Sequence, residues 1–294
     1  MALPSYATPA QKAGYYTFLT YCGLVFFFLI APIFIIIPLS FNVSPFFGFT
    51  EGMLKLDPEA YSLRWYRQML GICDEGVTTV CTDKWMLGTV NSFIIGLSAT
   101  FLATTLGTLA ALGLSRPNMP FKGLLMALLI SPMIVPLIIT AAGIFFFYAK
   151  FGLVGTYTGL ILAHTALGTP FVVITVTATL TGFDTNLIRA AQSLGADTMR
   201  TFFKVIMPLI LPGVISGALF AFITSFDEVV VVLFLGSVEQ QTIPRQMWSG
   251  IRQEISPVIL CMATCLVALS IALLTTVELL RRRSERLRGI KLRN

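Results

Sequence analysis

Two adjacent carboxylates, Asp227 and Glu228, stand inside an apolar part of the sequence. Residues 205–226 before them and residues 229–238 after them contain no charged side chain. Burying a carboxylate at membrane depth costs at least ~2.5 kcal/mol unless it faces water, a cation or a hydrogen-bonding partner. The pair therefore either lines an acidic pathway for a cationic solute or is a structural pair held by serines, backbone groups or an arginine of a partner subunit.

The side chains near this pair limit the chemistry that the region can perform. Diamines and triamines carry ammonium groups on methylene stems, and carboxylates and aromatic faces are natural receptors for such groups. Trp248, close to Arg245 in the sequence, is either part of a gate or an interfacial anchor. We expect His164 to be a hydrogen-bonded packing residue. No nucleophile–base constellation accompanies these residues, so the sequence predicts no catalytic residue.

The chain has no recognisable means of hydrolysing a nucleotide by itself. No segment fits G-x-x-x-x-G-K-[ST], and the dipeptide Gly-Lys does not occur, so no loop of this type can hold nucleotide phosphates. No Cys/His spacing resembles a zinc site, and we expect neither a metal nor a cofactor in this chain. Energy for active transport must then come from a partner protein.

The segment 181–204 is longer than a simple connection between two membrane spans needs to be. It reads TGFDTNLIRAAQSLGADTMRTFFK. Asp184 or Thr185 can cap a short helix, Gly195 supplies the left-handed residue that ends it, and Asp197 can cap a second helix. On periodicity alone, the segment is either a projection that fits a groove of another protein or an interfacial helix on lipid headgroups.

Composition identifies a membrane protein. Of 294 residues, 56% are hydrophobic and 12% are charged, whereas soluble domains carry about 25% charged residues. Windows that exceed the ~20 apolar residues needed to cross a bilayer predict six spans, at 15–39, 87–114, 124–148, 157–180, 208–235 and 257–280. The net charge of +6 does not indicate nucleic acid, because seven of the twenty Lys and Arg residues lie in the last fourteen positions, next to a predicted span.

The basic residues also predict an orientation. Thirteen Lys and Arg residues fall on the side of the termini and seven on the other side, and the richer side stays in the cytoplasm. We therefore expect both termini in the cytoplasm. The predicted layout is a cytoplasmic segment at 1–14, a transmembrane domain at 15–280 with an outer loop at 41–84 and a cytoplasmic loop at 181–204, and a basic tail at 281–294.

The five cysteines fall into two groups. Cys22, Cys261 and Cys265 lie in apolar spans, where a thiol behaves as a small hydrophobe. Cys73 and Cys81 flank the polar stretch DEGVTTV on the predicted outer side, where an oxidising compartment permits a bridge. We expect a disulfide between these two, with two unpaired thiols as the alternative.

The loop at 181–204 carries a spaced pattern that belongs to a known family. The pattern is Ala190-Ala191, three residues, Gly195, nine residues, Val205, one residue and Met207-Pro208. It resembles the EAA loop of permease subunits of bacterial ATP-binding cassette (ABC) importers, which reads Glu-Ala-Ala, three residues, Gly, nine residues, Ile, one residue and Leu-Pro. Here Arg189 replaces the Glu, Val205 the Ile and Met207 the Leu. By this resemblance, these seven residues couple the chain to an ATPase.

Three further segments resemble one branch of that family. YSLRWYRQML, NSFIIG and SFDEVVVVLFLG look like the polyamine (spermidine/putrescine) branch of the type I importer permeases, and the resemblance covers residues 18–280. It implies an all-α, polytopic membrane protein with six transmembrane helices and the type I importer permease fold. It also implies location in a bacterial inner membrane.

The resemblance implies a set of partners. These are ATPase subunits that bind ATP and Mg, a second and usually non-identical permease subunit, an extracytoplasmic solute-binding protein and membrane lipid, with no role for nucleic acid. The implied function is a translocation pathway for a small organic cation, foremost a polyamine. Another amine or an amino-acid-like solute remains open, as does a secondary transporter or channel, although that class does not explain the spaced Ala-Ala…Gly…Pro pattern.

Overall fold

The chain is built from helices, as the sequence predicts. The computed structural model describes residues 6, 8–72, 83–116, 118–184, 186–253 and 256–287, with side chains described as far as residue 276. Within these ranges the only extended pairing is an isolated bridge between Asn42 and Tyr61. The chain divides into two compact units, one formed by Met1–Thr82 with Ile255–Asn294 and the other by Asp83–Glu254.

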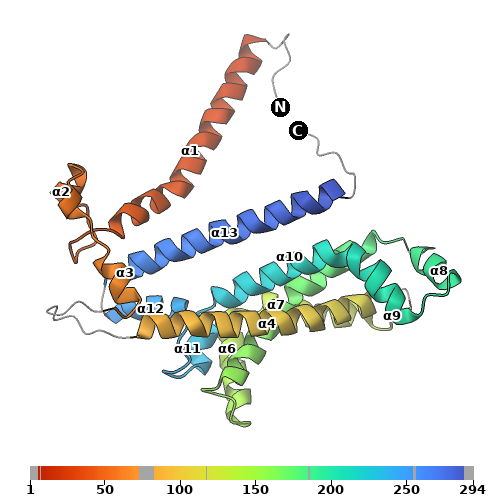
Figure 1. Cartoon of the computed structure of the whole chain (residues 1–294). Coiled ribbons are helices and arrows are strands. Elements are labelled where there is room, and N and C mark those ends of the chain that lie inside the picture. The colour runs from red at the N-terminus through yellow and green to blue at the C-terminus, as the bar shows by residue number, and fades with distance from the viewer. Residues whose placement is uncertain are drawn as a thin grey trace. The chain divides into compact units, whose positions relative to one another are not determined.

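The first unit contains two long apolar helices, α1 (Pro9–Leu39) and α13 (Val258–Leu287), coloured red and blue in Figure 1. Thr8 begins α1 with a capping box: its Oγ1 accepts from the Gln11 N–H at 3.3 Å, and its N–H donates to Gln11 Oε1 at 3.0 Å. The helices contact each other, and Cys261 Sγ of α13 donates to the Ser40 carbonyl at 3.2 Å. The thiol therefore helps to hold the end of α1.

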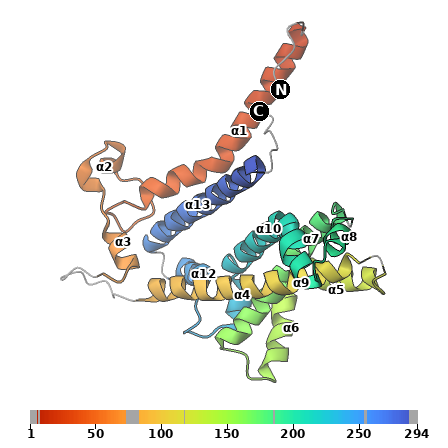
Figure 2. The same cartoon turned by 45° about the vertical axis from the view of Figure 1, so that its right-hand side comes forward.

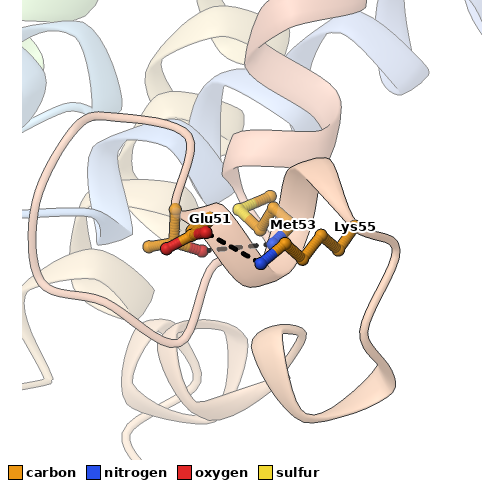
Figure 3. Close-up of polar contacts among 4 residues, drawn as sticks. Glu51, Met53 and Lys55 are labelled. Carbon is orange, nitrogen blue, oxygen red and sulfur yellow. Dashed lines mark hydrogen bonds and ion pairs between the residues drawn. The ribbon is translucent and has the colours of Figure 1, made fainter.

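Short helices fill the segment that follows α1. They are α2 (Glu51–Leu54), the 3₁₀ turn η1 (Pro58–Ala60) and α3 (Arg64–Met69). The buried Trp65 donates its indole N–H to the Asn42 carbonyl at 2.7 Å, and the Tyr66 hydroxyl lies 2.7 Å from Ser40 Oγ. Figure 3 shows α2, where Lys55 pairs with Glu51 at 2.7 Å. Both charged side chains are exposed, so this pair adds little stability.

The second unit has a core of three packed helices, α4 (Lys84–Leu114), α7 (Tyr157–Thr181) and α10 (Met207–Phe226), which Figures 1 and 2 both show side by side. Val172 lies at the centre of this contact and is fully buried. A Cβ atom on Gly107 would come 2.7 Å from Val172 Cβ, and one on Gly217 would come 2.8 Å from Val172 Cα. The glycines therefore allow the close helix approach on which packing in membranes depends.

The third predicted span is two helices rather than one. α5 (Lys122–Ile134) and α6 (Leu137–Ala149) meet at an angle of 104°. Pro136 causes the break, because proline lacks a backbone N–H and drives the preceding residue, Val135, into the extended region. The predicted span at 124–148 is therefore bent at Pro136 and is not one straight helix.

The fifth predicted span also differs from the prediction of one helix over 208–235. The helical segment begins earlier, with α9 (Thr198–Thr201) and the π-helical turn η2 (Phe202–Ile206), and α10 ends at Phe226. The short helix α11 (Val230–Leu235) follows and packs against α6, and α12 (Ile243–Gln253) comes after a turn. The charged residues after Phe226 thus lie between helices and not inside one.

The described helices supply up to six apolar crossings. Five helical segments are long and apolar enough to cross a membrane, and the bent pair of α5 and α6 makes a sixth if it is counted as one span. This agrees with the six predicted spans, although two of them have a different shape.

Candidate functional site

The predicted coupling loop folds as two capped helices. The Asp184 carboxylate accepts from the Asn186 N–H at 2.9 Å, directly before α8 (Asn186–Ser193). Gly195, with φ of 82°, ends the helix, and the Ala196 N–H donates to the Ala191 carbonyl at 3.0 Å. This is a Schellman arrangement, in which glycine takes the left-handed position. The Asp197 carboxylate then caps α9 by accepting from the Arg200 N–H at 2.7 Å.

Most of the residues predicted for coupling lie at the surface of the loop. Arg189, Ala190 and Gly195 are exposed, Ala191 is half-buried, and a side chain added at Gly195 would meet no described atom within 4 Å. The neighbouring Leu194 is 88% exposed. The loop thus presents small residues and an apolar side chain on a surface that its own caps hold in shape.

The remaining residues of the spaced pattern lie where the loop joins α10. Val205 is in the π-helical turn η2, and Met207 and Pro208 begin α10. The Met207 N–H donates to the Phe202 carbonyl, a bond that spans five residues. Proline has no N–H to continue an α-helical ladder, and a π-type turn is one way in which helices accommodate this.

The acidic pair forms the break between α10 and α11, and its two members have different surroundings. Asp227 is exposed, and no described residue makes a hydrogen bond to its side chain. Glu228 is only 7% exposed, and its Oε1 accepts from the Val231 N–H at 2.9 Å. Glu228 therefore satisfies a backbone donor at the start of α11, whereas the Asp227 carboxylate is available to a solute.

His164 is confirmed as a hydrogen-bonded packing residue. It lies in α7 and is 1% exposed, and its Nδ1 is 2.8 Å from the hydroxyl of Ser225 in α10. The bond ties α7 to the end of α10, two residues before Asp227.

An aromatic cluster lies on the face shared by α4 and α10. The rings of Phe93 and Phe226 meet edge to face with centroids 5.4 Å apart, and those of Phe222 and Phe226 are 5.2 Å apart. Gly96 of α4 lies directly against Phe222 and Phe226. The last turn of α10 before Asp227 is therefore aromatic.

Trp248 lies on α12 and is 46% exposed. The Arg252 guanidinium is 5.6 Å from its ring centroid, a distance at which cation–π attraction acts. Arg245 instead donates to the Ser237 carbonyl at 2.7 Å, and partial burial lowers the pKa of its guanidinium. The structure therefore places the Arg252 guanidinium, and not that of Arg245, over the Trp248 ring. Cys73 and Cys81 lie outside the described residues, and their disulfide stays a prediction.

Sequence reasoning missed one set of polar contacts. Asn91 of α4 binds the turn at residues 236–242 and accepts from Tyr157 of α7, and Ser92 of α4 accepts from the Ile243 N–H at the start of α12. The signal that was available is a pair of polar residues at the start of an apolar span, because a buried amide needs partners.

The sequence of this chain matches a known family of transport proteins. The model of binding-protein-dependent transport system inner membrane components matches residues 103–286, more than half of the chain. The chain belongs to this family.

Individual relatives and a solved structure agree with this membership. The spermidine/putrescine transport system permease protein PotC of Haemophilus influenzae is 29% identical over 261 residues, covering 89% of this chain and 95% of the relative. The putrescine transport system permease protein PotI of Escherichia coli is 30% identical over 253 residues, covering 83% of each. A crystal structure of a bacterial ABC transporter involved in the import of the acidic polysaccharide alginate aligns with a TM-score of 0.68 at 14% identity, covering 95% of this chain and 99% of that one.

The chain is therefore a permease subunit of an ABC importer and a multi-pass protein of the inner membrane. This confirms the family predicted from the spaced loop pattern. It also excludes the alternative of a secondary transporter or channel.

Proposed function

We propose that this permease subunit forms part of the translocation pathway for a polyamine such as putrescine or spermidine. The observation that carries the proposal is the similarity to PotC and PotI over most of the chain. The fold alone does not select the solute, because a neighbour with the same fold comes from an importer of an acidic polysaccharide. Another amine or an amino-acid-like solute is the alternative.

Asp227 is the acidic group that we assign to this pathway. Its carboxylate is exposed at the end of α10, next to an aromatic turn that contains Phe222 and Phe226. A charge-assisted contact with an ammonium group is stronger than a neutral hydrogen bond. Glu228 has a separate role, because its carboxylate already binds the backbone of α11. Trp248 is assigned to the same pathway as part of a gate, and an interfacial anchor is the alternative.

The loop with Arg189, Ala190, Ala191 and Gly195 is proposed as the docking surface for the ATPase. Its exposure supports this role. The other residues of the family pattern lie where the loop meets the membrane helix: Val205 in η2, and Met207 and Pro208 at the start of α10. Arg189 replaces an acidic residue of that pattern, so we expect it to face an acidic group on the ATPase. ATP and Mg would bind only to that partner.

Assembly and orientation complete the proposal. A second, non-identical permease subunit would complete the pathway, and an extracytoplasmic solute-binding protein would deliver the solute. The distribution of Lys and Arg supports cytoplasmic termini, which places the coupling loop on the side of the ATPase.

Uptake by cells tests the solute assignment. Cells that lack their own polyamine importers would express this chain with its partner subunits and be given radiolabelled putrescine or spermidine. Uptake should require the chain and stop when the ATPase partner is inactivated. Two outcomes would contradict the assignment. One is the absence of polyamine uptake by the wild-type importer. The other is uptake that an excess of an amino acid suppresses as strongly as unlabelled polyamine does.

A further inference from the structure

The turn at residues 236–242, which joins α11 to α12, is held by a buried amide from another helix. Asn91 of α4 is 1% exposed. Its Nδ2 donates to the Glu239 carbonyl at 2.7 Å and to the Gln241 carbonyl at 2.9 Å, and its Oδ1 accepts from the Tyr157 hydroxyl at 2.8 Å. One side chain thus joins α4, the start of α7 and two carbonyls of the turn.

Additional bonds attach both ends of the turn. The Gly155 N–H, just before α7, donates to the Leu235 carbonyl at 2.7 Å. The Ile243 N–H at the start of α12 donates to Ser92 Oγ of α4 at 2.8 Å. The residue before the turn is therefore bonded to the segment that precedes α7, and the residue after the turn is bonded to α4.

The chemistry of Asn91 indicates why an amide occupies this position. An asparagine side chain has two N–H donors and one carbonyl acceptor, and here both donors and the acceptor are used. An unsatisfied buried amide would destabilise the fold, whereas a fully satisfied one fixes the position of the groups that it binds. Together, α11 and the turn connect the break at Asp227 to α12, which carries Trp248, so the position of the turn affects the distance between these two residues.

We propose that Asn91 is a positioning residue that fixes residues 236–242 on α4 and α7. During transport, α11, the turn and the start of α12 then move with α4 and α7 as one body. The proposal concerns the importer subunit itself and does not depend on the identity of its solute.

An engineered disulfide measures whether the turn stays in place. A Cβ atom built on Gly155 lies 3.7 Å from Ser237 Cβ, close to the spacing of about 3.8 Å found in disulfides. In the assembled importer in nanodiscs, the Gly155→Cys/Ser237→Cys pair should form a bridge on mild oxidation. Gly155 has a φ of 72°, a conformation that strains residues other than glycine. Gly155→Cys alone measures the effect of that strain, and Ser237→Cys alone reports any bridge to a native cysteine.

Variants of Asn91 in this background test the proposal. Asn91→Ala should slow bridge formation about tenfold, since two hydrogen bonds to the turn are lost. Asn91→Asp keeps the shape but has no donor and should slow it as well, and Tyr157→Phe should have a smaller effect. Thr105→Val is the matched control, because Thr105 donates only to the Phe101 carbonyl of its own helix. An unchanged rate in both Asn91 variants would overturn the proposal.

The closed bridge then tests motion during transport. If the turn moves with α7, the oxidised pair keeps the ATP hydrolysis rate that the reduced pair shows with solute-loaded binding protein. Loss of that activity on oxidation, with recovery on reduction, would mean that the turn must separate from α7, and would overturn the proposal. The wild-type uptake assay tests the polyamine assignment separately.

Discussion

The segment from Thr198 to Phe226 has two ends that are stabilised in opposite ways. At one end the coupling loop depends on local caps, such as the Asp197 carboxylate on the Arg200 N–H. At the other end, bonds between distant residues hold the structure, such as Ser225 to His164 in α7. Most side chains of the first end are exposed, with Thr201 as a buried exception, whereas several side chains at the second end are buried.

The difference agrees with the two roles that we propose for the ends of this segment. A locally capped loop keeps its shape through bonds between neighbouring residues, which leaves its exposed side chains accessible to a partner. An end held by several helices keeps charged and aromatic groups at fixed positions. Substitutions in the loop should therefore affect coupling without unfolding the chain, and substitutions of buried residues at the other end should affect stability.

The largest effect is expected in the coupling loop. Gly195→Asp should abolish solute-stimulated ATP hydrolysis in the assembled importer, because the added side chain would block close approach of the ATPase. Folding should persist, since the position is open within this chain and Asp tolerates the left-handed conformation better than most residues. Ala191→Glu should act in the same way.

Ser193→Ala is the matched control for the loop, because Ser193 Oγ donates only to the Arg189 carbonyl of its own helix. It should leave hydrolysis unchanged. Normal coupled turnover in both Gly195→Asp and Ala191→Glu would contradict the docking assignment.

Asp227→Asn should produce the next largest effect. Loss of a charge-assisted contact of ~1.5–3 kcal/mol corresponds to about a ten- to hundredfold weaker transport constant for a polyamine. Concentration-dependent uptake measures this constant, and co-purification of the subunits checks assembly. Glu228→Gln should have little effect on uptake, because a side-chain oxygen remains for the Val231 N–H. Unchanged kinetics in both single variants and in the double variant would make the pair structural and weaken the case for a cationic solute.

Ser225→Ala should lower the free energy of unfolding by ~1–3 kcal/mol, because it leaves the buried His164 Nδ1 without its partner. Thermal or denaturant unfolding of the purified chain measures the change. Thr224→Ala is the control on the same helix, since no described residue makes a hydrogen bond to the Thr224 side chain. Equal destabilisation by the two variants would show that the bond to His164 contributes nothing measurable.

The smallest effect is expected for the bond between Glu228 and the start of α11. Glu228→Ala removes the acceptor for the Val231 N–H and should cost about 1 kcal/mol of stability, a typical value for one hydrogen bond. Asp227→Ala should leave stability unchanged in the same unfolding experiment, because its side chain is exposed. A larger loss for Asp227→Ala than for Glu228→Ala would reverse the roles assigned to the pair.

The sequence was most informative where structure depends on neighbours in the chain. The caps at Asp184 and Asp197 and the left-handed Gly195 were predicted and are confirmed, because each acts on residues two to five positions away. The composition of the apolar windows was likewise sufficient for the number of spans. It could not show the breaks at Pro136 and Asp227, because proline and charged residues also occur inside continuous membrane helices.

Contacts between distant residues were not predictable. Asn91 and Glu239 are 148 positions apart, and nothing in a single sequence relates them. The different roles of Asp227 and Glu228 depend on where α10 ends, and that end depends on packing with α7. A helical periodicity places adjacent side chains on different faces but does not say which face is buried.

The π-helical turn at Phe202–Ile206 affects how the loop is rotated about the axis of α10. A π-type turn holds one residue more than an α-helical turn, and each residue of an α-helix advances the chain by about 100°. Removing one residue there would restore a regular helix and rotate α9 and the loop before it about the axis of α10 by roughly that angle. The nine residues between Gly195 and Val205 thus determine the direction that the coupling loop faces, and not only its distance from the membrane.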